Sequence, residues 1–223
     1  MRHFLFLTFV ALSGSHLAQA QVTSFNIDSS KFDTSLMATL DSIYNKDQST
    51  RIAYIKAKQR NESTALLDSL NSNMRSIDVQ NLQKVNAIIK KHGWLGPQKV
   101  GVQASQALFL VIQHADLKTQ EYYLPMIRAA EKNGETLSSN LAIFEDRICM
   151  RTGKKQIYGS QGFTDKETGN KYIYPVIDVD NLDKRRETMG MPPMQEYSKG
   201  WDLEKYKKEL PKIEEIVKRE NIK

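Results

Sequence analysis

Apolar residues recur at three- and four-residue steps through most of the chain between residues 30 and 150. Such spacing puts the apolar side chains on one face of an α-helix. It predicts a helix from about Ser30 to Tyr44, a second from about Asp47 to Leu70 and a third from about Asp78 to His92. The polar run "KAKQRNEST" inside the second helix is either a solvent-facing stretch or a break.

The run "VQASQALFLVIQHAD" at 102–116 is the most apolar helical segment that follows the N-terminal leader. It is apolar over much of its circumference, which predicts a central position in the fold. Two more helical patterns come after it, "TQEYYLPMIRAAEKNG" and "LSSNLAIFEDRICMRTG". Each is closed by a glycine, Gly134 or Gly153, and glycine favours the left-handed backbone at a helix C-terminus.

Beyond residue 153 the period of the pattern changes. The runs "KQIYGSQGF" and "KYIYPVI" alternate, with the turn-forming "TDKETGN" between them, which predicts a β-hairpin at about 154–177. Alternation would put Gln156, Tyr158 and Ser160 on one face of its first strand. Helical periodicity returns after Asp178 and continues into the tail, whose apolar stripe is typical of a surface helix docked on the body.

These elements indicate a mainly α fold, namely a helical domain with an appended β-hairpin and a C-terminal surface helix. The chain length suits one domain with a proper core and short additions. We therefore expect a single helical domain at 21–200, with the hairpin at about 154–177, and a C-terminal helical tail at 201–223.

The first residues, "MRHFLFLTFVALSGSHLAQA", combine a basic start, an apolar run and a small-x-small ending. This layout predicts a signal peptide cleaved after Ala20 and a periplasmic or secreted protein, with an uncleaved N-terminal anchor as the alternative. The full chain has a formal net charge of +6, and cleavage removes only Arg2 from the charged residues. An exported chain with dispersed basic residues is not expected to bind nucleic acid, nor to carry an integral membrane span.

Little in the composition points to a cofactor. Cys149 is the only cysteine, so an intramolecular disulfide is excluded and a buried inert thiol is expected in preference to a catalytic one. Only His92 and His114 follow the leader, without an H-E-x-x-H motif, and no metal site is predicted. There is no Gly-x-Ser-x-Gly elbow and no glycine-rich phosphate loop, so no cofactor is predicted either.

Polar side chains interrupt the apolar helix at 102–116 in a regular way. Gln106, Gln113 and Gln120 are each seven residues apart and share one stripe, with Asp116 beside it, whereas His114 points to another face. A buried amide without a partner costs about 1–3 kcal/mol, so other polar groups must meet this stripe. The candidates for those partners are Asp146, Arg147, Gln156, Tyr158 and Gln161.

This polar set has two readings. In the functional one, His114 is a general acid or base, Asp116 or Asp146 orients it, and Arg147 holds an anionic ligand group together with the glutamines. In the structural one, His114 is a core histidine bonded to a backbone carbonyl, and Arg147 is a bridge between a helix and the hairpin. His-x-Asp is too common a spacing to decide between the two readings.

Several motifs in order carry a family resemblance: "DQSTR" at 47–51, "HGWLG" at 92–96, "VGVQASQALFLVIQHAD" at 100–116, "EDR" at 145–147, "QIYGSQ" at 156–161 and "DKRRETMGMPPMQEY" at 183–197. Over about residues 30 to 200 the chain resembles a bacterial family of unknown function. One departure is Ser160, where the family pattern usually has threonine. The resemblance implies no chemistry, but it adds further candidate ligand-binding residues: Asp47, Gln48, Arg51 and Trp94.

A signature so rich in amides, carboxylates and an arginine is more polar than a fold requires. We therefore expect an exported protein with a polar ligand-binding or catalytic pocket for a polar small-molecule or cell-envelope ligand. Hydrolysis of an envelope glycan or peptide is the candidate reaction. The alternative is a non-catalytic envelope interaction module whose polar cluster is structural. Whether the chain is an enzyme, and its oligomeric state, stay open.

Overall fold

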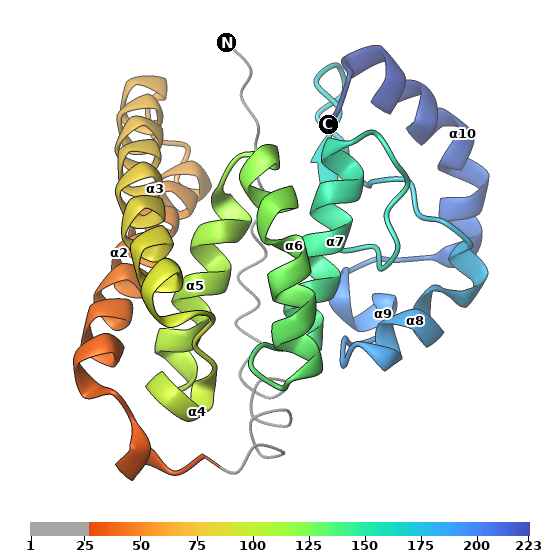
Figure 1. Ribbon diagram of the computed structural model, residues 1–223. Coiled ribbons are helices and arrows are strands. Elements are labelled where there is room, and N and C mark those ends of the chain that lie inside the picture. Colours follow the sequence, from red (N-terminus) through yellow and green to blue (C-terminus); the bar gives the residue numbers. More distant parts are fainter. Residues whose placement is uncertain (1–26) are drawn as a thin grey trace. The chain divides into compact units, whose positions relative to one another are not determined.

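The computed structural model describes residues 27–223, so the predicted signal peptide lies outside the described residues. Helices dominate the described part, which confirms the mainly α fold class, and one small antiparallel hairpin accompanies them (Figure 1). None of these helices is long and apolar enough to cross a membrane. The described chain divides into two compact units, an N-terminal unit that ends at Thr136 and a C-terminal unit, Leu137–Lys223. The domain bounds predicted from the sequence stay a prediction.

Two long helices, α2 (Thr34–Gln59) and α3 (Thr64–His92), form an antiparallel pair at the start of the N-terminal unit (Figure 1). The sequence pattern predicts three helices here, and that prediction is wrong. The chain turns at residues 60–63, so the run "KAKQRNEST" is a break. Ser63 caps α3 by accepting the N–H of Leu66. The polar stretches taken for gaps stay helical because α2 packs on both α3 and α5, and such packing overrides weak local propensity.

A short 3-10 turn, η1 (Ser29–Lys31), precedes α2, and the rest of this unit consists of three helices. These are α4 (Pro97–Val100), α5 (Val102–His114) and α6 (Leu117–Lys132). The predicted central position of α5 is confirmed, because it packs against α2, α3, α4 and α6. Trp94 is buried in the loop before α4 and donates its indole N–H to the carbonyl of Glu135.

The C-terminal unit begins with α7 (Ser138–Arg151) and continues into the strands β1 (Gly162–Thr164) and β2 (Lys171–Ile173). The strands are antiparallel, with Phe163 opposite Tyr172. The remaining elements are η2 (Val179–Asn181), α8 (Leu182–Thr188), α9 (Met194–Tyr197) and α10 (Leu203–Glu220). One apolar core joins them, made of Met150, Phe163, Tyr174, Val176, Leu182, Met194, Tyr206, Ile213 and Ile216.

The hairpin is shorter than predicted. A hairpin exists, but residues 154–161 are not a strand, and the only ladder contact there is an isolated bridge between Gln156 and Val176. The chain turns at Gly159, whose φ of +70° favours glycine, and a Cβ there would press against the side chains of Met194 and Leu182. Because this segment is not a strand, Gln156, Tyr158 and Ser160 do not lie on one face of a strand as the alternation predicts.

The C-terminal helix α10 is amphipathic, as the apolar stripe of the tail predicts, but it is more than an addition. Tyr206, Ile213 and Ile216 are almost fully buried in the core of the C-terminal unit. The hydroxyl of Tyr206 accepts the N–H of Val176 and donates to the carbonyl of Tyr174, both next to the hairpin. The helix therefore completes the second unit.

We predict that Ile213→Ala destabilises the protein by about 2–5 kcal/mol, the usual cost of removing most of a buried isoleucine. The measurement is chemical unfolding of residues 21–223 followed by circular dichroism. Glu215→Ala, an exposed position on the same helix, is the matched control and should change little. Equal stability of the two variants would mean that α10 contributes no core to the unit.

Candidate functional site

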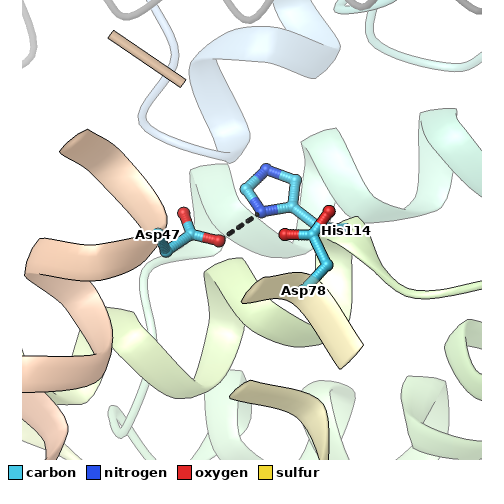
Figure 2. A group of neighbouring side chains, drawn as sticks. All are labelled: Asp47, Asp78 and His114. Carbon is cyan, nitrogen blue, oxygen red and sulfur yellow. Dashed lines mark hydrogen bonds and ion pairs between the residues drawn. The ribbon is translucent and has the colours of Figure 1, made fainter. Parts of the chain in front are cut away.

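A histidine–carboxylate pair lies inside the N-terminal unit (Figure 2). His114 is the last residue of α5, and its Nδ1 lies 3.0 Å from Oδ1 of Asp47 on α2. Their side chains are 6% and 1% exposed. An ionised carboxylate can only accept a hydrogen bond, so Nδ1 carries the hydrogen and donates it to Asp47. In the neutral ring the lone pair is then at Nε2, which Figure 2 shows on the side of the ring away from Asp47.

Arg51 binds two carboxylates at once. It stands one turn after Asp47 on α2, and its Nε and Nη2 donate to Oδ2 and Oδ1 of Asp47 at 3.3 Å and 3.2 Å. The same Nη2 also donates to Oδ1 of Asp78 on α3. Gln48 adds a bond from its amide to Oδ2 of Asp47 at 2.7 Å. We call Asp47, Arg51, Asp78 and His114 the Asp47 cluster.

The two carboxylates of the Asp47 cluster have opposite pKa shifts. Burial alone would raise the pKa of Asp47, but the bond from His114 and the charges of His114 and Arg51 lower it well below its ordinary value. Burial raises the pKa of Asp78 to about 6; Arg51 opposes the rise and the charge of Asp47 adds to it. Asp78 therefore takes up a proton more readily than Asp47, although it is bonded to Arg51, because burial raises its pKa by more than Arg51 lowers it.

Part of the Asp47 cluster resembles a metal site. One ligand atom each from Asp47, Asp78 and His114 lies within 4.8 Å of the others, and these are ligand types that a divalent cation accepts. Nη2 of Arg51, however, bonds to both carboxylates and already supplies a positive charge between them. The arrangement suits proton transfer better than metal binding.

The other sequence candidates of the N-terminal unit have defined contacts. Asp116 is exposed and caps α6 by accepting the N–H of Thr119 at 2.7 Å. The carboxylate that accepts the hydrogen bond from Nδ1 of His114 is therefore Asp47. The sequence pattern suggests Asp116 or Asp146 for this position. Nε2 of Gln120 donates to the carbonyl of Gln113 at 2.6 Å, so these two candidates lie together.

Asp146 organises the C-terminal unit. Its buried carboxylate on α7 accepts the backbone N–H groups of Ile157, Tyr158 and Ser160, and also the hydroxyl of Ser160. Burial raises the pKa of Asp146, and these four donors oppose the rise. The carboxylate replaces the strand partner that the backbone would otherwise need, which is why residues 157–160 curve around it instead of forming a strand.

The side-chain amide of Gln156 also bonds to backbone groups of this unit. Its Nε2 donates to the carbonyls of Gln161 and Tyr174, and its Oε1 accepts the N–H of Gln161. Nε2 of Gln161 in turn donates to the hydroxyl of Ser160 at 3.0 Å. The amides of both glutamines therefore hold the segment 156–161 in shape.

Two arginines on α8 complete this support, and the sequence candidates do not include them. Nη1 of the fully buried Arg186 donates to the carbonyl of Tyr158 at 2.6 Å, and its guanidinium stacks 4.3 Å from the ring centre of Tyr197. Nε of Arg185 donates to the carbonyl of Ile157. The only sequence signal for this pair is its place in the family-like run 183–197. Arg147, the predicted ligand clamp, is 3% exposed on α7.

The predicted polar residues thus form two groups. Asp47, Gln48, Arg51, Gln113, His114 and Gln120 belong to the N-terminal unit, and Asp146, Arg147, Gln156, Tyr158 and Gln161 belong to the C-terminal unit. That all of them line one pocket stays a prediction. The residue that sequence reasoning missed in the first group is Asp78, since nothing in its local pattern marks it as more than a polar position on a helix.

Comparison with known proteins supports the family resemblance. The model of a family of unknown function, DUF6624, matches residues 34–206. Neither the search of curated proteins nor the search of solved structures found a match. The comparisons therefore supply a family and no activity, and the chemistry has to be inferred from the residues.

We predict that Asp78→Asn changes stability in a pH-dependent way. A carboxyl whose folded-state pKa, about 6, exceeds its ordinary value of 3.8 binds more protons when folded. Its contribution to stability is therefore present at low pH and lost as the pH rises through about 6. The variant has no carboxyl group at position 78 and therefore does not lose this stability as the pH rises. The difference between its Tm and that of the wild type should therefore become more positive between about pH 4 and pH 7. Asp68→Asn, exposed on the same helix, should show no such trend, and a flat difference for both variants would contradict the shift.

We also predict that Asp146→Ala costs about 3 kcal/mol of stability or more, because each buried donor left unpaired costs about 1–3 kcal/mol. Denaturant unfolding of residues 21–223 measures the loss, with Glu187→Ala, an exposed position, as control. A loss of less than about 1 kcal/mol would show that the loop does not depend on this carboxylate.

Proposed function

We propose that this chain, which belongs to DUF6624, a family of unknown function, is an exported protein that uses the Asp47 cluster as an acid–base site on a polar cell-envelope ligand. One observation carries the proposal: His114 donates through Nδ1 to a buried carboxylate that is held ionised. The predicted leader supplies the compartment, and the candidate reaction is hydrolysis of an envelope glycan or peptide.

The histidine has the arrangement that general base catalysis requires. Imidazole titrates near neutral pH, and a carboxylate on Nδ1 fixes the tautomer whose Nε2 accepts a proton. Asp47 is itself fixed by Arg51 and Gln48, so the ring of His114 is held through two layers of hydrogen bonds. Such support keeps a catalytic group in one orientation without reorganisation during the reaction.

The carboxylates complement the histidine. Asp47 remains charged, whereas Asp78 holds a proton up to about pH 6. Two titratable groups whose environments separate their pKa values are the usual sign of an acid and a base in one site. Asp78 is also the most open member of the Asp47 cluster, with 25% of its side chain exposed. It is therefore the member of the cluster that is in most contact with solvent.

In a hydrolytic step, His114 would take a proton from water at Nε2 while the water oxygen bonds to the electrophilic carbon of the ligand. The bond from that carbon to the leaving oxygen or nitrogen then breaks. The leaving atom takes a proton from Asp78 or from the imidazolium of His114. Atoms and charges balance without a metal or a redox partner.

A second candidate is a non-catalytic interaction module. The low exposure of His114 and Arg147 favours it, because a buried and paired histidine also stabilises a fold. In that case the Asp47 cluster would join α2, α3 and α5, and another surface of the chain would meet an envelope partner. Removing His114 would then lower stability and change no reaction.

The test is release of soluble fragments from purified bacterial peptidoglycan by residues 21–223, followed by mass spectrometry. His114→Gln should lower the rate of release by about 100-fold or more, the usual contribution of a general base. Asp47→Asn keeps the side-chain volume but removes the charge that fixes the tautomer, and it should also be slow. His92→Ala, the other histidine beyond the leader, is the matched control and should retain the wild-type rate.

Folding of each variant is checked by circular dichroism at the assay temperature. If the wild type releases nothing, or if His114→Gln and Asp47→Asn release fragments at the wild-type rate, the acid–base proposal is wrong. Absence of release together with a lowered Tm for His114→Gln would favour the interaction module.

A further inference from the structure

Asp47 and Arg51 connect the buried histidine of the Asp47 cluster to its most exposed member. Oδ1 of Asp47 accepts two hydrogen bonds, one from Nδ1 of His114 and one from Nη2 of Arg51. The same Nη2 carries a second hydrogen, which it donates to Oδ1 of Asp78. The bonds therefore form one continuous chain that runs from Asp78 on α3 through two residues of α2 to His114 on α5.

Asp78 and His114, the two ends of this chain, also lie close to each other. One ligand atom of each, together with one of Asp47, lies within 4.8 Å of the others, and Figure 2 shows the carboxylate of Asp78 beside the ring of His114. Opposite charges at such a separation shift the protonation of a carboxylate or an imidazole by about 1–3 pH units. The protonation state of either group therefore changes the affinity of the other for a proton.

The charges of the Asp47 cluster suit the uptake of one proton. Arg51 is always positive, because a guanidinium does not lose its proton in a protein. When Asp47 and Asp78 are both ionised and His114 is neutral, two negative charges and one positive charge give a net charge of −1. One added proton, on Asp78 or on His114, makes the cluster neutral. A second proton would leave a net positive charge among buried groups, which is costly.

The remaining ionisable side chains of these helices are less able to decide where that proton goes. Those of the helices packed on α5 that lie at exposed positions are screened by solvent: Lys46 on α2, Arg75 on α3, Lys99 on α4, and Asp116, Lys118 and Glu121 around the start of α6. Tyr123 on α6 is bonded to Asn86, and burial raises the pKa of its hydroxyl, so it stays neutral where Asp78 and His114 titrate.

We infer that the Asp47 cluster holds a single exchangeable proton, for which Asp78 and His114 compete. His114 is then a strong base only while Asp78 is ionised, because the proton that His114 takes up balances the negative charge of Asp78. The inference rests on the proposed function for its role in a reaction, and it narrows that reaction. With Asp78 ionised when His114 acts, the leaving atom takes its proton from the imidazolium of His114. Asp78 is a positioning residue that sets the basicity of the histidine through charge.

The test is a proton NMR titration of residues 21–223 that follows the Cε1–H signal of His114 between about pH 4 and about pH 9. Only His92 and His114 follow the leader, and His114→Gln assigns the two signals. Asp78→Asn removes the negative charge that favours a protonated ring, so the midpoint of His114 should fall by about one pH unit or more. His92 is the internal reference and should keep its midpoint.

Variants of Arg51 should give a shift of the opposite sign. Arg51→Gln removes the positive charge beside Asp47, so the midpoint of His114 should rise, and Arg51→Lys, which keeps that charge, should bring it most of the way back. A purely structural role would lower the Tm of these variants without moving the histidine in opposite directions. Asp68→Asn, exposed on α3, is the matched control for Asp78→Asn and should leave the midpoint unchanged.

Two results would overturn the inference. One is a midpoint of His114 that stays within about 0.2 pH units of the wild type in folded Asp78→Asn. The other is a shift of the same sign in Asp78→Asn and Arg51→Gln, which would indicate a change in the exposure of the ring instead of a change in charge. Circular dichroism establishes folding, and if Arg51→Gln does not fold, Asp78→Asn decides alone.

The titration needs no ligand, so its failure and that of the proposed function can be told apart. If the wild type releases no fragments from peptidoglycan but the midpoint shifts as expected, the acid–base proposal is wrong and the shared proton stands. If release depends on His114 but the midpoint does not move in Asp78→Asn, the reaction stands and the shared proton is wrong.

Discussion

A carboxylate removed from water must be met by hydrogen-bond donors, and each unit of this chain is arranged around one such group. In the N-terminal unit, Asp47 joins α2 to α5 through His114, and Arg51 extends the link to α3. In the C-terminal unit, Asp146 collects three backbone N–H groups and a hydroxyl from the segment before the hairpin. Without these donors each carboxylate would be buried and unpaired. The need to supply the donors therefore fixes where α2, α3, α5 and the segment 157–160 lie within their units.

The sequence predicts the kinds of elements well and their limits less well. The central helix, the existence of a hairpin and the amphipathic C-terminal helix follow from hydrophobic periodicity. The continuity of α2 and α3 does not, because their polar stretches are stabilised by packing against α5 rather than by their own propensity. The segment 156–161 imitates a strand because its residue types alternate, but Asp146 and Gln156 satisfy its backbone in place of a neighbouring strand.

The candidate site, too, could be predicted from the sequence only in part. His114, Asp47, Arg51, Asp146 and Gln156 all lie in motifs, and all of them are engaged in buried hydrogen bonds. The pairing within that set could not be derived, since Asp47 is far from His114 in sequence and Asp116 is close to it. Asp78 and Arg186 have no local signal, because each becomes important only when the fold brings it to a partner from another element.

The turn at residues 60–63 has a consequence for how this chain can change in length. Asp47 and Asp78 stand at nearly equal distances in sequence from that turn, deep within two uninterrupted helices. One residue inserted between Asp47 and the turn, or between the turn and Asp78, would rotate that carboxylate by about 100° about the helix axis. Residues added at the turn itself would not. Insertions and deletions among relatives should therefore occur at residues 60–63, whereas the number of residues between this turn and each carboxylate should stay constant.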